Sequence, residues 1–150
     1  MSETSMPSSL QEAIEDIEMA GESDRPLFLI DYSDRFEAVP PEIATKPYPE
    51  FNHVKECESD AYVFPEARDD GTLNFHFDVL NPQGVSARAF SKLLKDAIDG
   101  QPAEVINAIP DDIITRLFGK GISMGKGLGL RGILNMVKYF ANEHAKNQGS

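Results

Sequence analysis

The residues Ala61-Tyr62-Val63-Phe64 are followed, after Arg68-Asp69-Asp70-Gly71, by Leu73-Asn74-Phe75-His76-Phe77, and this segment is the best guide to the fold. Both outer runs are rich in β-branched and aromatic residues, and an Asp-Gly pair between two such runs is a strong signal for a β-hairpin. In the second run the large apolar residues alternate with polar ones. One face of the hairpin is therefore predicted to be buried and the other to be wet.

Apolar residues recur at helical spacing on both sides of this hairpin. A capping box from Ser9 to Glu12 predicts a helix start, and Asp24-Arg25-Pro26 predicts another. Residues 39–49 hold four prolines and are predicted to be a connector without regular structure. The expected helices cover residues 9–19, a segment from about 24 to 32, the segment of Phe90 that ends at Asp99-Gly100, and residues 102–109, 110–118 and 130–145. This order predicts an α+β fold, in which a short antiparallel sheet of about three strands is packed on one face by helices.

Length and charge narrow the possible functions. The chain has 150 residues, which suits one domain, predicted over 9–146 between flexible ends at 1–8 and 147–150. A net charge of -11 repels phosphate backbones and argues against nucleic-acid binding. No apolar run approaches the roughly 20 residues of a membrane span. The N-terminus lacks the pattern of a secretory signal, and a cytoplasmic location is expected.

Cys57 is the only cysteine of the chain, and its sequence neighbours are mostly polar or charged. A lone thiol on a polar loop can be a nucleophile, a persulfide carrier or a redox sensor, and it can also be an inert, partly buried side chain. The nearby carboxylates of Glu56, Glu58 and Asp60 disfavour a thiolate. We therefore expect slow alkylation of Cys57 in the free protein, and activation of the thiol only when a partner docks.

Other candidate groups carry weaker signals. His53 and His76 are possible bases for the thiol, although each can equally be an ordinary exposed histidine. The residues Gly127 to Gly132 match G-x-G-x-x-G, but no strand is expected before them, which argues against a dinucleotide site. The simpler interpretation is close packing or a tight turn before the last helix. Alternatively, Ser123 to Gly129 form a surface loop next to the thiol. The three histidines of the chain are scattered along the sequence, so no metal site is expected.

The segment from Asn52 to Tyr62, N-H-V-K-E-C-E-S-D-A-Y, resembles the active-cysteine segment of the SufE family, whose common form is N-x-V-x-G-C-x-S-x-V-W. The likeness covers roughly residues 24–145. It runs through the Asp-Gly hairpin and the helix of Phe90, and then through Gly100–Val105 to Ser123–Leu130. The resemblance implies a SufE-like α+β fold and, in this sequence, an acceptor role for Cys57.

SufE-like proteins take sulfur from a pyridoxal-phosphate-dependent cysteine desulfurase of the SufS type, stimulate it, and pass the sulfur to an iron–sulfur scaffold such as SufBCD. The resemblance thus implies a sulfur-transfer accessory protein rather than a stand-alone enzyme. It implies no cofactor in this chain, because the pyridoxal phosphate belongs to the desulfurase. By the same resemblance Glu56 and Ser59 shape the loop, and Arg88 and Lys126 contact the partner. Glu56 stands where the family commonly has glycine, and Lys126 where it has arginine, which indicates a divergent branch.

Two other functions stay open on the sequence. The chain can be a binding module that regulates a desulfurase without carrying sulfur, or a cysteine enzyme acting alone. The acidic loop and the lack of a triad pattern disfavour the second of these. A role as iron–sulfur scaffold is disfavoured as well, because such clusters typically need about four protein ligands, mostly thiolates.

Overall fold

The predicted hairpin is present as β1 (Ala61–Ala67) and β2 (Leu73–Val79) in the computed structural model, which describes residues 5–148. The strands are antiparallel and pair Val63 with Phe77. In the turn, the N–H of Arg68 donates to the carbonyl oxygen of Thr72 at 2.9 Å, and Gly71 has a φ of 88°. That backbone conformation favours glycine, which explains why the Asp-Gly pair marks the turn.

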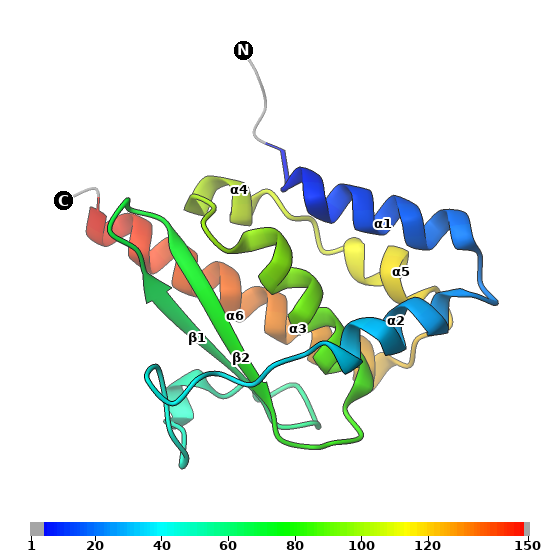
Figure 1. Cartoon of the computed structure of the whole chain (residues 1–150), viewed down its shortest axis with the longest axis horizontal. Helices are drawn as coiled ribbons and strands as arrows, with labels where there is room; N and C mark the ends of the chain where they lie inside the picture. The colour runs from blue at the N-terminus through cyan, green and yellow to red at the C-terminus, as the bar shows by residue number, and fades with distance from the viewer. Residues whose placement is uncertain (1–4, 149–150) are drawn as a thin grey trace.

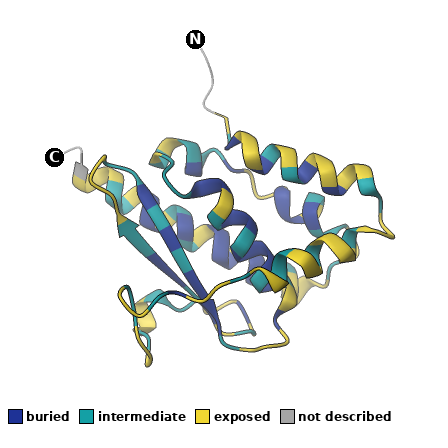
Figure 2. Ribbon diagram, in the orientation of Figure 1, coloured by how far each residue is buried: buried dark blue, intermediate teal, exposed yellow. Residues whose placement is uncertain are grey.

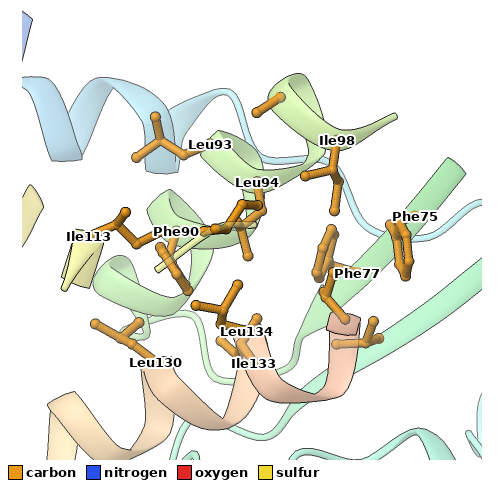
Figure 3. Packing of buried hydrophobic residues seen from close by; sticks show 14 of the residues in the cluster. Phe75, Phe77, Phe90, Leu93, Leu94, Ile98, Ile113, Leu130, Ile133 and Leu134 are labelled. Carbon is orange, nitrogen blue, oxygen red and sulfur yellow. The ribbon is translucent and has the colours of Figure 1, made fainter. Parts of the chain in front are cut away.

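One face of the hairpin packs on two long helices, α3 (Val85–Ile98) and α6 (Met124–Gln148), which lie side by side behind the sheet (Figure 1). The β2 residues that face them are Leu73, Phe75, Phe77 and Val79, all buried. Figure 3 shows the phenylalanines of β2 against the apolar stripes of α3 and α6. Burial of each large apolar side chain contributes about 1.5–3 kcal/mol, so this layer is the main source of stability.

The shorter elements surround this layer (Figures 1 and 2). They are α1 (Ser8–Ala20), α2 (Arg25–Asp34), the 3-10 helix η1 (Glu50–Asn52), α4 (Ala103–Asn107) and α5 (Ile113–Phe118). The α+β class and the packing of helices on one face of the sheet are as predicted. Residues 39–49 contain no helix or strand, which confirms the predicted connector.

The prediction of about three strands was wrong, because the described residues form a sheet of two strands only. The outer edge of β2 is closed by groups that are not part of a strand, and their hydrogen bonds to β2 backbone are 2.7–2.9 Å long. The groups are the backbone N–H of Val39 and Gly100, the carboxylate of Asp99, the ammonium of Lys95 and the guanidinium of Arg88. Backbone groups at a sheet edge need partners, and these five supply them without a third strand.

The outer edge of β1 is closed by the segment that leads into the cysteine loop. The N–H of Val54 donates to the carbonyl oxygen of Ala61 at 2.8 Å, and the amide of Asn52 donates to that of Val63 at 2.8 Å. Only one bridge, between His53 and Tyr62, has strand geometry here. The cysteine loop is therefore attached to the sheet at its entrance.

The second face of the hairpin is less exposed to solvent than predicted, because Tyr48 of the connector covers part of it. The Tyr48 ring lies 5.0 Å from the rings of both Tyr62 and Phe64. Its hydroxyl donates to Asp78 at 2.6 Å, and Asp78 and Phe64 are both buried. Burial, followed by the hydrogen bond to the Asp78 carboxylate and its charge, raises the pKa of Tyr48 to about 12.

Two helix starts differ from the prediction. α1 begins at Ser8 without a side-chain cap, so the predicted capping box at Ser9 was wrong. α6 begins at Met124 rather than near 130, and the predicted surface loop from Ser123 to Gly129 is the start of this helix. Of the termini predicted to be flexible, residues 1–4 and 149–150 lie outside the described residues, whereas Met6 packs against the core.

Candidate functional site

Cys57 lies between two consecutive turns that connect η1 to β1. Its N–H donates to the carbonyl oxygen of Val54 at 3.1 Å, and its own carbonyl accepts the N–H of Asp60 at 3.3 Å. Asp60 has a φ of 56°, in the left-handed region that aspartate tolerates better than most residues. Its carbonyl accepts the N–H of Leu80 at 3.1 Å, which anchors the exit of the loop next to β2.

The thiol is buried although its neighbours along the chain are exposed. Cys57 keeps 8% of its accessible surface and belongs to the hydrophobic core, whereas Glu56 and Glu58 are exposed. The two turns point Cys57 toward α6 and the charged side chains toward solvent. The sequence left open whether this thiol is buried or exposed, and the structure places it at the edge of the core.

A cavity of about 150 Å³ lies next to Cys57. It is bounded by the cysteine loop, the start of α3 and the start of α6. The residues that line it are Cys57, Glu58, Ser59, Gln83, Gly84, Val85, Ser86, Ala87, Gly125, Lys126, Gly129 and Leu130. Its volume is several times the roughly 30 Å³ that a water molecule occupies in the liquid, so it can hold a small group attached to the thiol.

Burial raises the pKa of the Cys57 thiol, because a thiolate loses its hydration there. Hydrogen bonds from the N–H groups of Ser59 and Ala61 and from the Ser59 hydroxyl act in the opposite direction, and the charge of Asp60 adds a smaller rise. The expected direction is thus correct, but its main cause is burial rather than the loop carboxylates. The same donors are positioned to stabilise a sulfur anion once it forms.

The residues expected around the thiol fall into two groups. Ser59 and Lys126 line the cavity with Cys57, and Lys126 is its only basic lining residue in the described part of the chain. Glu56 and Arg88 do not line it. Glu56 is exposed, and its side chain lies against Gly132 of α6; its predicted loop-shaping role stays a prediction.

Arg88 is used inside the protein. Its guanidinium donates to the carbonyl oxygen of Val79 at 2.9 Å and lies 5.5 Å from the centre of the Phe36 ring. Its Nε is buried without a hydrogen-bond partner. These contacts give Arg88 a structural role at the edge of β2, and they do not depend on a partner protein.

Both histidines proposed as bases pair with carboxylates elsewhere. The ring nitrogens of His53 lie 3.2 Å from Glu50 and 3.3 Å from Asp60. The Nε2 of His76 lies 2.8 Å from Glu66. Neither histidine lines the cavity beside Cys57. Neither His53 nor His76 is therefore placed as the base of a self-activated cysteine enzyme.

The start of α6 is the part of the site that the sequence described least well. The hydroxyl of Ser123 accepts the N–H of Lys126 at 3.2 Å, which is the geometry of an N-cap. Four glycines follow within ten residues, and their low helix propensity hid the true start of the helix. The serine was the signal that could have located it. The suggestion that this segment lies next to the thiol is confirmed, since Gly129 contacts Cys57.

Other kinds of site find no support in residues 5–148. No group of three or more histidine, cysteine, aspartate or glutamate side chains there could hold a metal ion. Within the same residues, no helix combines the length and apolar character that a membrane span requires.

Comparison with known proteins assigns most of the chain to one family. The family model described as "SufE: Fe-S metabolism associated domain" matches residues 11–141, which is most of the chain. The protein belongs to the SufE family. This membership associates it with iron–sulfur metabolism and confirms the resemblance seen around Cys57.

The relatives of this SufE-family chain include curated proteins from two strains of Mycobacterium tuberculosis, each named an uncharacterized SufE-like protein. Each is 27% identical over 113 residues, covering 75% of this chain and 76% of the relative. A solution structure of a hypothetical protein from Thermus thermophilus has the same fold, with a TM-score of 0.73 and 20% identity. That similarity covers 94% of this chain and 98% of the Thermus chain.

Proposed function

We propose that this protein accepts the outer sulfur of a desulfurase persulfide on Cys57 and carries it to iron–sulfur cluster assembly, stimulating the desulfurase as it does so. The observation that carries this proposal is the position of Cys57, which lines a cavity at the junction of its loop with α3 and α6. Membership of the SufE family supports the connection to iron–sulfur metabolism.

The proposed transfer is thiolate attack on sulfur. The Cys57 thiol first loses its proton to solvent, from which the departing desulfurase thiolate can take one up, and the Cys57 thiolate attacks the outer sulfur of the cysteine persulfide on the desulfurase. A new S–S bond forms on Cys57 while the S–S bond of the desulfurase breaks, and the desulfurase cysteine leaves as a thiolate. There is no net oxidation or reduction, because zero-valent sulfur moves from one thiolate to another.

The surroundings of Cys57 suit a carrier better than an independent catalyst. Burial holds the free thiol protonated and shields it from oxidants and unrelated thiols. After transfer, the outer sulfur would occupy the cavity, where Lys126 and the donors of Ser59 favour an anion. The thiol becomes reactive when the loop engages a partner that replaces its buried surroundings.

A pyridoxal-phosphate-dependent cysteine desulfurase of the SufS type is the proposed donor, and a SufBCD-type scaffold the proposed acceptor. A cytosolic location is proposed as well, because a reducing compartment keeps a single thiol free. The net charge of -11 would steer this chain toward a basic surface on its partner.

The direct test incubates the protein with a SufS-type desulfurase and cysteine and then measures its intact mass. A gain of one sulfur that dithiothreitol removes and that maps to Cys57 is expected. The Cys57→Ser variant provides the control and should gain no sulfur. If the native protein gains none under conditions in which the desulfurase turns over, the carrier function is wrong.

The same variant separates the carrier from a regulatory binding module. A carrier loses stimulation of the desulfurase in the Cys57→Ser variant, because the persulfide has no acceptor. If the variant stimulates the desulfurase as well as the native protein does, binding without sulfur transfer is the function.

A further inference from the structure

The loop of Cys57 rests on a part of α6 that carries no side chains. A Cβ atom placed on Gly129 would lie 3.1 Å from Cα of Cys57 and 3.4 Å from the carbonyl oxygen of Glu56. A Cβ atom on Gly132 would lie 2.9 Å from Cγ1 of Val54 and 3.0 Å from Oε1 of Glu56. Loop and helix are thus closer at both positions than an ordinary side-chain contact allows.

The other glycines at the start of this helix do not share this property. A Cβ atom on Gly125 or Gly127 would meet nothing within 4 Å. Gly129 and Gly132 are three residues apart and lie on the same face of α6. Among the glycines of α6, close approach to the loop therefore belongs to this pair and is not a general consequence of the glycine-rich sequence. Outside this helix, Gly84 also lies close to the loop, at the side chain of Ser59.

The section of the loop above this pair makes turn hydrogen bonds within the loop, from Cys57 to Val54 and from Asp60 to Cys57, and meets α6 through packing. Its ends are fixed by backbone hydrogen bonds, from Val54 to Ala61 at one end and from Asn81 to Ser59 at the other, at 2.8 and 3.2 Å. Between these ends Glu56 and Glu58 are exposed, and only Cys57 is buried. The middle of the loop can therefore move while its ends stay attached to the sheet.

We propose that Gly129 and Gly132 form a seat that holds Cys57 in its buried position, and that the closeness of this contact sets how readily the thiol becomes accessible. Resting on the proposed function, this inference gives the two glycines a positioning role in sulfur transfer. A tight seat protects the persulfide, and release from the seat presents it to a partner.

The test compares Gly129→Ala with Gly127→Ala in the free, full-length protein. Both variants add one methyl group to the same helix and favour the helix equally, but only the methyl at 129 meets the loop. At neutral pH, Gly129→Ala should raise the rate of Cys57 alkylation by iodoacetamide about fivefold or more, as expected for modest overpacking at a tight contact. Gly127→Ala should stay near the native rate.

Hydrogen exchange distinguishes release of the loop from general loss of stability. In Gly129→Ala, faster exchange should be confined to the amides of residues 55–60. Equal alkylation rates in the two variants would overturn the proposal. So would faster exchange that extends through β2 and α3, because the thiol would then be exposed by unfolding of the core.

A second pair of variants covers the case in which Gly129→Ala does not fold. Gly132→Ala should also speed the alkylation of Cys57. The nearest atom to the added methyl group is Cγ1 of Val54, so Val54→Ala should relieve the clash. The double variant should therefore react at about the rate of Val54→Ala alone. Additive effects of the two substitutions would contradict the seat. None of these measurements uses a desulfurase, so the seat and the carrier function can fail independently.

Discussion

The ammonium of Lys95 on α3 donates to the backbone carbonyl of Phe75 on β2 at 2.7 Å. The same ammonium pairs with Asp99 at 2.8 Å, and Asp99 accepts the N–H of Phe75 at 2.7 Å. Lys95 and Asp99, four residues apart, thus provide hydrogen-bond partners for both the carbonyl oxygen and the N–H of Phe75 at the outer edge of β2. This pair does at the middle of β2 what a third strand would otherwise do.

Replacing Lys95 with Met should lower the free energy of unfolding by about 1–3 kcal/mol, because the carbonyl of Phe75 loses its donor and Asp99 its cation. Denaturant unfolding measures the change. Lys92→Met is the matched control, since within residues 5–148 Lys92 pairs only with Asp96, one turn along the same helix, at 3.0 Å. That pair is worth about 0.5 kcal/mol or less. Equal losses in the two variants would contradict the edge-closing role.

The alkylation rate of Cys57 should depend on pH with a midpoint above that of a short peptide containing the same cysteine. Burial raises the pKa of the thiol above its ordinary value of 9.0, so less thiolate is present at neutral pH in the folded protein. The folded state binds this proton more tightly than the unfolded state does. The resulting contribution to the free energy of unfolding is complete below pH 9.0 and is lost as the pH rises from there through the raised pKa of the folded protein. A midpoint at or below that of the peptide would contradict the buried thiol.

Two substitutions should move this midpoint in opposite directions. Ser59→Ala removes a hydroxyl that lowers the pKa of Cys57, and should therefore raise the midpoint. Asp60→Asn removes a charge that raises the pKa, and should lower the midpoint slightly. Stopped-flow alkylation over a range of pH gives both values. Shifts of the same sign in both variants would show that the loop conformation, and not these groups, had changed.

Lys126→Met should reduce the rate of sulfur acceptance from a desulfurase by about three- to tenfold, because the cavity then lacks the cation that favours the negative charge carried by Cys57 as its persulfide forms. Mass spectrometry at short reaction times measures the rate. Lys120→Met is the matched control, because Lys120 is exposed and does not line the cavity. If both variants accept sulfur equally fast, Lys126 has no particular role at the thiol.

His53→Ala and His76→Ala should leave the alkylation rate of Cys57 within about twofold of the native rate, since a base must lie within hydrogen-bond reach of its nucleophile. Each ring pairs with carboxylates outside the cavity. A rate that fell about 100-fold or more in either variant, the lower end of general-base effects, would instead indicate a cysteine enzyme that acts alone.

Sequence patterns predicted those elements whose conformation depends on residues close together in the chain. The Asp-Gly turn, the alternation along β2 and the apolar stripe of α3 each specify an element through its own geometry. The number of strands was predicted less well, because side chains of α3 and the N–H of Val39 complete the sheet edge. These groups are distant from β2 or lie outside any strand pattern, and their pairing is visible only after packing.

The residue pattern alone showed a single cysteine, its place on a loop before a hairpin, and the resemblance of this segment to the SufE family. The burial of Cys57, the cavity that it shares with Lys126 and Ser59, and the contacts of Arg88 with Val79 and Phe36 became visible only in the folded chain. The physical reason is that burial depends on what packs against a residue. Glycines more than 70 positions away on α6 allow the loop to close on the core, and no pattern around Cys57 encodes that contact.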